Sequence, residues 1–243
     1  MKKINNTVLI TGGASGIGFA LAKKLVKQKN TVIVVGRDEK KLHAAKAEIP
    51  QLITLKADIS CEQDRQSLVK IIMNDYPKLN YLINNAGIQI QTYFDKDQPP
   101  LKQIEKEMDV NFIGPVRLTS LLIPTLKKQK EAKVINISSG LAIVPKKDTP
   151  IYCASKAALS IFSMSLGYQL ENSSIRVIDV KTPLIDTNMT KGRGKGKISP
   201  DVFANNLLKK IQKGKVGEIR IGKVKILYFL YRFFPYLAYK IMK

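Results

Sequence analysis

Short apolar runs alternate with longer amphipathic stretches along most of this chain. The runs are rich in β-branched residues and predict strands at 7–10, 31–35, 52–56, 81–83, 134–137, 175–180 and 218–221. The stretches between them predict helices at 17–29, 39–49, 64–76, 101–130 and 203–212. A further helix is predicted to follow residues 148–151 and to end near residue 170. The alternation predicts a single α/β domain over residues 1–243, with a doubly wound parallel sheet and helices on both faces.

Two segments depart from the regular pattern. Residues 88–100 are polar and rich in turn formers, so they predict a loop. The helix at 101–130 contains prolines, and we expect it to be interrupted near Pro115 or Pro124, because proline removes a helical hydrogen bond. Glycine and proline form no linker-like block, which favours a single domain.

The chain is strongly basic, with 41 Lys and Arg against 19 Asp and Glu and a net charge of +22. Residues 191–243 carry 14 of these cations and only two acidic residues. Such an excess favours anionic partners, although a general richness in lysine would also produce it. The chain shows no signal peptide, and Cys61 and Cys153 match no metal-ligand spacing. We therefore expect a cytoplasmic protein with free thiols and no metal site.

A cluster of glycines follows the first strand. Gly12, Gly16 and Gly18 stand between the strand at 7–10 and the helix at 17–29. Glycine lets the backbone turn sharply and approach a phosphate, and a helix N-terminus offers N–H donors and a positive dipole. A glycine turn in the first strand–helix unit of an α/β sheet predicts a dinucleotide site.

The end of the second strand predicts which dinucleotide binds. An acidic side chain there would bind the ribose 2′-hydroxyl of NAD, but this chain has Gly36 followed by Arg37. A guanidinium suits the 2′-phosphate of NADP, so we expect NADP rather than NAD. The alternative is that Arg37 only opens the next helix on a solvated face. Asp58, after the third strand, is either an adenine contact or a cap for the helix that starts near Cys61.

Tyr152 and Lys156 are four residues apart in the helix that ends near residue 170. This spacing puts both side chains on one face, one turn apart. An ammonium beside a phenol lowers the pKa of the phenol, and a tyrosine tuned in this way exchanges a proton with a carbonyl or alcohol oxygen. A surface tyrosine and a solvated lysine have the same spacing, so the pair gains meaning only from the motifs before it.

In their order and spacing, these motifs resemble those of the short-chain dehydrogenase/reductase family, over residues 7 to about 222. The residues that carry the resemblance are Thr11-Gly12-x-x-x-Gly16-x-Gly18, Asp58, Asn84-Asn85-Ala86-Gly87, Asn111, Ser139, Tyr152-x-x-x-Lys156 and Pro183 to Thr187. The resemblance implies a Rossmann fold with a seven-stranded sheet of order 3-2-1-4-5-6-7, in a homodimer or homotetramer. It also implies an NADP-dependent oxidoreductase that transfers hydride between nicotinamide and a carbonyl or alcohol substrate.

The resemblance also implies roles for individual side chains. Tyr152 is the implied general acid/base, Lys156 lowers its pKa and binds the nicotinamide ribose, and Ser139 orients the substrate oxygen. Ser139 is preferred to Ser138 because it has the family spacing of 13 residues to the tyrosine. Asn111 is implied to hold a proton-relay water. The implied cofactor-binding residues are Gly12, Ser15, Gly16, Ile17, Gly18, Arg37, Asp58, Ile59, Asn85, Ala86, Gly87, Tyr152, Lys156, Pro183 and Thr187.

For some of these residues the resemblance also implies which part of the cofactor they contact. Asp58 corresponds to the adenine contact, residues 85–87 to the wall beside the cofactor ribose, and Thr187 to the hydroxyl that holds the carboxamide. One position departs from the family, because Leu184 follows Pro183 where glycine is usual. Leucine narrows the backbone freedom near the nicotinamide, so the geometry of this loop stays open.

Residues 188–200 correspond to the lid that covers the substrate in this family. Lys191, Arg193, Lys195 and Lys197 alternate with glycine there, which predicts a flexible and strongly cationic loop. Such a loop either closes on an anionic substrate or stays disordered and solvated.

The C-terminal tail, residues 224–243, mixes aromatic and basic side chains. It is too broken by charges and by Pro235 to span a membrane, but its composition suits an interfacial helix on anionic lipid, at the inner membrane face. The alternative is that the tail packs on a neighbouring subunit or covers the substrate pocket. Its Arg-Phe-Phe-Pro stretch, residues 232–235, is similar to a bacterial branch of the family associated with D-alanylation of teichoic acids.

Two other functions compete with the oxidoreductase. One is a membrane-associated, cofactor-binding sensor or scaffold without turnover. The presence of Asn111, Ser139, Tyr152 and Lys156 argues against it, because a retired site need not keep all four. The other is a nucleic-acid binder. We expect no nucleic-acid partner, because the sequence has no binding motif and its basic residues interleave with glycine more than with aromatic side chains.

Overall fold

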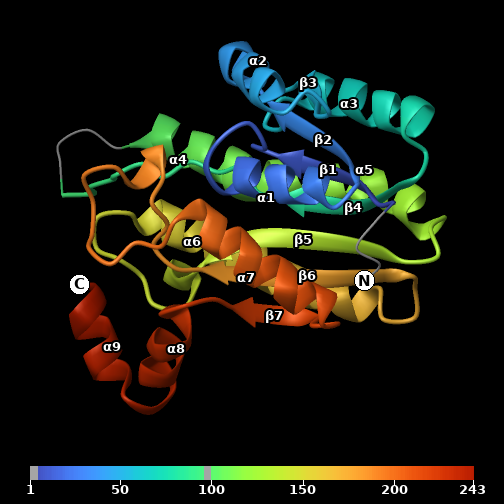
Figure 1. Cartoon of the computed structure of the whole chain (residues 1–243). Coiled ribbons are helices and arrows are strands. Elements are labelled where there is room, and N and C mark those ends of the chain that lie inside the picture. The colour runs from blue at the N-terminus through green and yellow to red at the C-terminus, as the bar shows by residue number, and fades with distance from the viewer. Residues whose placement is uncertain (1–4, 96–99) are drawn as a thin grey trace.

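The strands form one parallel sheet with helices on both sides (Figure 1). The computed structural model describes residues 5–95 and 100–243. The strand order is β3-β2-β1-β4-β5-β6-β7, which confirms the predicted fold class and the seven-stranded order 3-2-1-4-5-6-7. The strands are β1 (Thr7–Thr11), β2 (Thr31–Gly36), β3 (Ile53–Lys56), β4 (Leu79–Asn84), β5 (Ala132–Ser139), β6 (Ile175–Thr182) and β7 (Gly217–Arg220).

Helices connect the strands and cover both faces of the sheet. In Figure 1, α1 and α7 cross in front of the sheet, and a hairpin of α8 and α9 leaves it at one end. The helical segments are α1 (Gly16–Lys27), α2 (Glu39–Glu48), α3 (Glu62–Asp75), α4 (Leu101–Met108), η1 (Asp109–Ile113), α5 (Gly114–Lys127), η2 (Gly140–Ala142), α6 (Pro150–Gln169), η3 (Asn188–Thr190), α7 (Pro200–Gln212), α8 (Val224–Phe233) and α9 (Pro235–Met242).

Two hydrophobic clusters fill the space between the sheet and the helices. Val8 and Ile10 of β1 point into the cluster formed with α1, α2 and α7. Leu9, between them, points into the cluster formed with α3, α5 and α6. Side chains of a strand alternate between the two faces, so a strand buried on both sides must be apolar throughout. This is why the strands could be found as continuous apolar runs.

Strands β5 and β6 extend further than their apolar runs predicted. The predicted ranges 134–137 and 175–180 become Ala132–Ser139 and Ile175–Thr182. Except for Ala132 the added residues are polar, but β5 and β6 pair with each other from Ala132 up to Ser139 and Thr182. Both residues therefore end at the carboxyl edge of the sheet, where ligands bind in open α/β folds.

The helix predicted at 101–130 changes its winding instead of breaking at a proline. α4 runs through the π-helical turn η1 into α5. The interruption expected near Pro115 or Pro124 is therefore wrong. Pro115 lies in the first turn of α5, where proline is tolerated, and Pro124 is accommodated inside α5.

The loop predicted at 88–100 lies partly outside the described residues, at 96–99. Residues 88–95 form neither helix nor strand, as expected. They cross from the end of β4 towards the start of α6, where the N–H of Thr92 donates to the carbonyl oxygen of Asp148 at 3.1 Å.

Candidate active site

The glycine turn after β1 packs directly against the segment after β4. Gly12 and Gly16 adopt left-handed backbone conformations, with φ of +63° and +54°. A Cβ on Gly18 would lie 2.4 Å from the carbonyl oxygen of Gly12, and a Cβ on Gly12 would lie 2.9 Å from the Cα of Ala86. Side chains do not fit at these positions, so the turn stays thin above the carboxyl edge of the sheet.

Thr11 at the end of β1 joins this turn to residues 85–87. Its buried Oγ1 accepts the backbone N–H groups of Asn85 and Ala86, both at 3.1 Å. The Asn85 side chain donates to the carbonyl oxygens of Thr11 at 3.0 Å and Gly12 at 3.1 Å. Thr11 begins the glycine motif that carries the family resemblance, but it is absent from the predicted site residues, and its structural role appears only in these contacts.

The start of α1 faces the segment that follows β6. A Cβ on Gly16 would lie 3.2 Å from Cγ2 of Thr187, so the turn with Thr187 stands over the glycine turn. Ser15 is the N-cap residue of α1 but makes no capping bond with its side chain, and Ile17 packs against the core. The structure thus brings the predicted residues Gly16 and Thr187 together, with Ser15 next to Gly16 at the start of α1.

Arg37 and Asp58 meet where β2 and β3 end. Nη1 of Arg37 lies 3.4 Å from Oδ2 of Asp58. Oδ1 of Asp58 accepts the N–H of Ser60 at 2.9 Å and its hydroxyl at 2.6 Å, whereas the N-cap residue of α3 is Cys61. The helix-cap interpretation of Asp58 is therefore wrong, and the adenine contact stays a prediction.

Burial opposes the charge of Asp58, but the bonds from Ser60 and the Arg37 guanidinium outweigh it and lower the pKa of that carboxyl. Ile59, the next residue, is buried in the core.

The four predicted catalytic residues come from β5, α6 and the π-helical turn. Tyr152 and Lys156 are both buried on α6, and Nζ of Lys156 lies 5.8 Å from the centre of the Tyr152 ring. Ser139 shares a side-chain hydrogen bond with Tyr152. A Cβ on Gly87 would lie 3.2 Å from Oδ1 of Asn111 and 3.4 Å from Nζ of Lys156. Gly87, in the segment that packs on the glycine turn, therefore lies beside two of the predicted catalytic residues.

The π-helical turn fixes the side chain of Asn111. Its Oδ1 accepts the N–H of Ile88 at 2.8 Å, and its Nδ2 donates to the carbonyl oxygen of Ile88 at 2.9 Å and to Oγ of Ser155 at 3.1 Å. Lys156 donates to the carbonyl oxygen of Ile137 at 3.0 Å. Single π-turns inside helices are frequent at functional sites, and here the turn joins the helix to the loop after β4.

A buried charged cluster underlies the catalytic residues. Lys181 and Asp179 of β6 pair at 2.9 Å, and Ser160 of α6 donates to Asp179 at 2.8 Å. The hydroxyl of Ser138 also donates to Asp179. Because Ser138 is engaged there, the geometry favours the predicted choice of Ser139 for contact with a substrate.

Burial dominates the electrostatics of the tyrosine–lysine pair. Burial raises the pKa of Tyr152 to about 12, although the hydrogen bond with Ser139 acts to lower it. Burial lowers the pKa of Lys156 to about 8, whereas Asp179 and Glu107 act to raise it. We expected Lys156 to lower the pKa of Tyr152, but the shift has the opposite direction, because loss of solvation around the phenol outweighs the neighbouring charges.

Glu107 of α4 is a buried carboxyl group that sequence patterns do not reveal. Its Oε1 accepts the N–H of Ile90 at 2.9 Å, and its Oε2 has no hydrogen-bond partner among the described residues. Burial raises the pKa of Glu107, and the charge of Lys156 acts to lower it. In turn, Glu107 acts to raise the pKa of both Tyr152 and Lys156. Glu107 is therefore an electrostatic neighbour of the catalytic pair.

Replacing Glu107 with glutamine should move the alkaline limb of the pH profile for carbonyl reduction to lower pH. Loss of the carboxylate charge lowers the pKa of both Lys156 and Tyr152, and reduction requires a charged lysine and a protonated phenol. The measurement is kcat/KM against pH for this variant and for Glu105→Gln, which changes an exposed glutamate of the same helix. If the alkaline limb moves equally in both variants, or in neither, Glu107 does not act electrostatically on Tyr152 and Lys156 as proposed.

The basic loop at 188–200 packs back onto the segment that follows β6. A Cβ on Gly194 would lie 2.4 Å from Cδ2 of Leu184, so the leucine fills the space beneath this glycine. Pro183 lies against Gly222, whose Cβ would be 3.6 Å from Cγ of the proline. The departure from the family pattern at Leu184 thus serves the packing of the loop, and these contacts disagree with a fully solvated loop.

Arg193 is a residue of this loop whose charge acts on Tyr152, a predicted catalytic residue. It donates to Oε1 of Gln89 at 3.2 Å and to the carbonyl oxygen of Met189. Its charge acts to lower the pKa of Tyr152. The alternation of glycine and basic residues indicated a cationic lid but could not single out Arg193.

Together, the parallel sheet, the thin glycine turn and the tyrosine–lysine cluster define a dinucleotide-dependent dehydrogenase or reductase. A sequence model of the family "short chain dehydrogenase" matches residues 6–197, and the chain belongs to this family. The family resemblance is thereby confirmed.

Individual relatives agree with this assignment. "Uncharacterized oxidoreductase DltE" of Bacillus subtilis (strain 168) is 41% identical over 221 residues, which cover 88% of each chain. A short chain dehydrogenase from Burkholderia cenocepacia J2315, solved in complex with NADP, has a TM-score of 0.88 at 22% identity, covering 100% of this chain and 99% of that one. A 3-ketoacyl-(acyl-carrier-protein) reductase from Brucella melitensis, complexed with NADH, has a TM-score of 0.81 at 25% identity, covering 89% and 96%.

Proposed function

We propose that this chain is an NADP-dependent oxidoreductase that interconverts a carbonyl and an alcohol, with Tyr152 as the general acid/base. One observation carries the proposal. A Cβ on Gly87 would meet Oδ1 of Asn111 at 3.2 Å and Nζ of Lys156 at 3.4 Å, and Gly87 belongs to the same segment that packs on the glycine turn through Ala86. A dinucleotide held by the turn would therefore end beside the catalytic residues.

The glycine turn lets a dinucleotide approach its backbone closely. Gly12 and Gly18 pack on each other and on residues 85–86 without side chains, so the turn stays thin, and the N-terminus of α1 offers N–H donors beside it. Gly12 lies against Ala86, and Gly16 lies against Thr187. When bound, the nicotinamide supplies or accepts the hydride.

The proposed chemistry assigns one task to each catalytic side chain. Tyr152 donates its proton to the substrate oxygen during reduction, and Ser139 donates a second hydrogen bond to the same oxygen. Lys156 stabilises the phenolate that remains, because its ammonium lies close to the tyrosine ring. Asn111 holds the loop after β4 against α6 and orients a water that returns a proton to the lysine.

We assign the preference for NADP to Arg37. Gly36 at the end of β2 has no side chain to repel a 2′-phosphate, and the half-exposed guanidinium of Arg37 stands beside it. Its 3.4 Å contact with Asp58 is long, so a phosphate would compete well for the guanidinium.

Replacing Arg37 with alanine should raise KM for NADPH by about 10- to 100-fold, the worth of a charged hydrogen bond of ~1.5–3 kcal/mol. KM for NADH should change little, because NADH has no 2′-phosphate. Steady-state kinetics with both cofactors would measure the effect. The matched control is Lys40→Ala, a nearby exposed cation. An equal loss with NADPH and NADH in Arg37→Ala would contradict the assignment.

We propose that the substrate is a small molecule with an anionic group. Arg193 stands close enough to Tyr152 to lower its pKa, and it lies in a loop with three other cations. Oxidation of NADPH should be screened against paired carbonyl compounds that differ only in an added carboxylate or phosphate. Turnover of the anionic members supports the proposal, and turnover that ignores charge contradicts the anionic substrate. No oxidation of NADPH with any carbonyl would contradict the enzyme function itself.

We also propose that the chain forms a homo-oligomer through α5 and α6. Leu121, Ile161, Met164 and Tyr168 are large apolar side chains that these helices leave exposed. A second copy that covers them would remove this surface from water. Sedimentation velocity would measure the oligomeric state.

A further inference from the structure

The C-terminal hairpin, formed by α8 and α9, stands away from the sheet (Figure 1). Val224 and Ala238 are its only buried residues. Its base is fixed to the domain, because a Cβ on Gly140 would lie 3.2 Å from Cγ2 of Val224, and the guanidinium of Arg220 lies 3.2 Å from the centre of the Tyr228 ring. The hairpin is thus held in position, yet its own chain leaves most of it uncovered.

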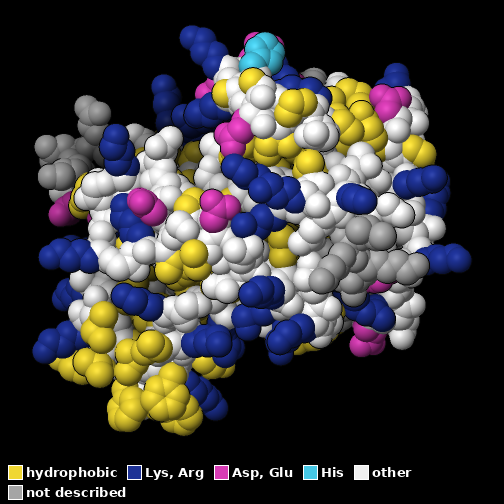
Figure 2. Space-filling view, viewed as in Figure 1, with side chains coloured by type: hydrophobic (Ala, Val, Ile, Leu, Met, Phe, Trp, Pro, Cys, Tyr) yellow, Lys and Arg dark blue, Asp and Glu magenta, His cyan; other side chains and the backbone are white. Residues whose placement is uncertain are grey.

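Figure 2 shows a hydrophobic patch over this hairpin. Of the 22 large apolar side chains that are exposed among the described residues, nine fall in this stretch. They are Ile226, Phe229, Tyr231, Phe233, Phe234, Tyr236, Leu237, Tyr239 and Ile241. A contiguous apolar patch on a folded protein marks an interaction site, whereas single exposed apolar residues need no explanation.

The aromatic rings of the patch are already packed on one another. The ring of Phe229 lies 4.9 Å from that of Phe233 and 6.5 Å from that of Phe234, measured between centres. Tyr231 of α8 meets Tyr239 of α9 edge to face at 6.1 Å. The contact between the two helices fixes the hairpin angle, so little conformational entropy remains to be lost on docking.

The charges of the hairpin itself have a single sign. Residues 221–243 contain five Lys or Arg and no Asp or Glu, whereas Arg220 at the base pairs with Glu218. A second copy of the hairpin would bring the same positive charge, which opposes association through this face. A surface of phosphate groups is complementary, and each Lys or Arg near such a surface contributes about 1 kcal/mol to its attraction.

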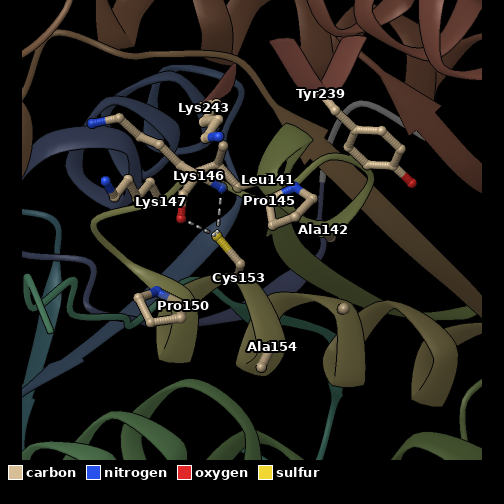
Figure 3. Close-up of a pocket in the computed structure, with 11 residues that line it drawn as sticks. Leu141, Ala142, Pro145, Lys146, Lys147, Pro150, Cys153, Ala154, Tyr239 and Lys243 are labelled. Atoms are coloured by element: carbon tan, nitrogen blue, oxygen red, sulfur yellow. Dashed lines mark hydrogen bonds between the residues drawn. The ribbon is translucent and has the colours of Figure 1, made fainter. Parts of the chain in front are cut away.

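A cavity of about 590 Å³ in the body of the protein also combines apolar and cationic side chains (Figure 3). It lies where α9 approaches the start of α6. Its lining includes the apolar side chains of Leu141, Pro145 and Tyr239 and the cations Lys146, Lys147 and Lys243. Lys146 pairs with Asp148 at 2.9 Å, whereas Lys147 and Lys243 offer ammonium groups to an anionic headgroup beside the apolar walls.

The hairpin suits a position in the interface and not across a bilayer. Among the described residues no helix has the length and apolar character to cross a membrane. α8 has 10 residues and α9 has 8, and Pro235 begins the second helix. Short amphipathic helices with aromatic side chains on one side and basic ones beside them lie in the plane of the lipid headgroups.

We propose that the C-terminal hairpin docks this protein on the surface of an anionic lipid bilayer. The aromatic patch enters the boundary between headgroups and acyl chains, and the basic residues of 221–243 contact lipid phosphates. Docking is independent of the proposed catalysis, because Tyr152 and the glycine turn take no part in it.

The test is binding of the full-length chain to vesicles of phosphatidylcholine alone and of phosphatidylcholine mixed with phosphatidylglycerol. Cosedimentation is expected with the mixed vesicles only, and it should weaken as salt is raised, because salt screens exposed charges. Equal binding to both vesicle types, or to neither, overturns the proposal. Inorganic phosphate and soluble glycerol phosphate should not compete, which separates a bilayer from a free anion.

Two pairs of variants locate the surface. The double variant Phe229→Ser/Phe233→Ser should lose vesicle binding by about 10-fold or more, because two large apolar groups no longer leave water. Its matched control is Ile71→Ser/Met73→Ser, two exposed apolar residues on α3, which should bind as the unchanged chain does. Likewise Lys225→Glu/Arg232→Glu should lose binding, while Lys40→Glu/Lys70→Glu should not. NADPH titration of each variant checks that it is folded.

The same variants test the alternative that a second copy of the chain, and not a lipid surface, covers the hairpin. If a second copy covered the hairpin, Phe229→Ser/Phe233→Ser would change the oligomer measured by sedimentation velocity and leave vesicle binding unchanged. That result overturns the proposal. Loss of vesicle binding with an unchanged oligomer supports it.

Discussion

Replacing Tyr152 with phenylalanine is expected to lower kcat by about 10²- to 10⁴-fold, the usual contribution of a positioned general acid. The substitution removes only the hydroxyl, so the ring still fills its buried place on α6. NADPH binding should therefore be retained. kcat is measured by NADPH oxidation with a carbonyl found in the substrate screen, and binding by NADPH fluorescence.

The control for this variant is Tyr168→Phe, which removes an exposed hydroxyl from the same helix. It should leave kcat unchanged. If Tyr152→Phe kept most of its kcat, another group would have to supply the proton. If it lost NADPH binding as well, the hydroxyl would be a binding group and its catalytic role would be unsupported.

The pKa of Tyr152 also bears on the direction of the reaction. With burial raising it to about 12, the phenol stays protonated near neutral pH. Reduction of a carbonyl needs this protonated form, whereas oxidation of an alcohol needs the phenolate. Tyr152 is thus in the form that donates a proton to a carbonyl oxygen, and it would have to lose that proton before it could accept one from an alcohol.

Most of the fold could be predicted because the sheet is buried on both faces. Continuous β-branched runs such as Val32–Val35 have no other place in a protein of this size, and helices between them force parallel strands. The errors occurred where local pattern carries no information. A π-helical turn has the same polar pattern as the α-helix around it, so the change at 109–113 could not be read, and Pro115 and Pro124 were misleading.

The residues of the candidate site likewise include some that could be predicted from the sequence and some that could not. Gly12, Gly18 and the Tyr152–Lys156 pair could be found because backbone approach and one-turn spacing leave a trace in sequence. Glu107 could not, because in a charged helix a buried glutamate reads like a solvated one, and only packing against Ile90 reveals it. The direction of the tyrosine pKa was wrong for a related reason: a spacing of four reports proximity but not desolvation.

Replacing Gly18 with alanine is expected to destabilise the fold by ~1–3 kcal/mol, as overpacking does, and to weaken NADPH binding. The new Cβ would lie 2.4 Å from the carbonyl oxygen of Gly12 and 2.5 Å from Nδ2 of Asn85. The carbonyl belongs to the backbone of the glycine turn and cannot rotate away, so the turn must move. Helix propensity alone would favour alanine by about 1 kcal/mol, so a loss must come from this contact.

The variant Gly167→Ala separates the steric effect expected at Gly18 from the gain in helix propensity that alanine brings. Gly167 also lies inside a helix, but its Cβ would meet nothing closer than 3.9 Å. This variant should be as stable as the unchanged chain or slightly more so, with unaltered NADPH binding. For Gly18→Ala, Tm should fall by about 2–4 °C for each kcal/mol lost. Thermal unfolding and NADPH fluorescence measure both effects. If the two alanine variants behaved alike, the turn would have room that the structure denies, and the cradle proposed for the dinucleotide would lose its physical basis.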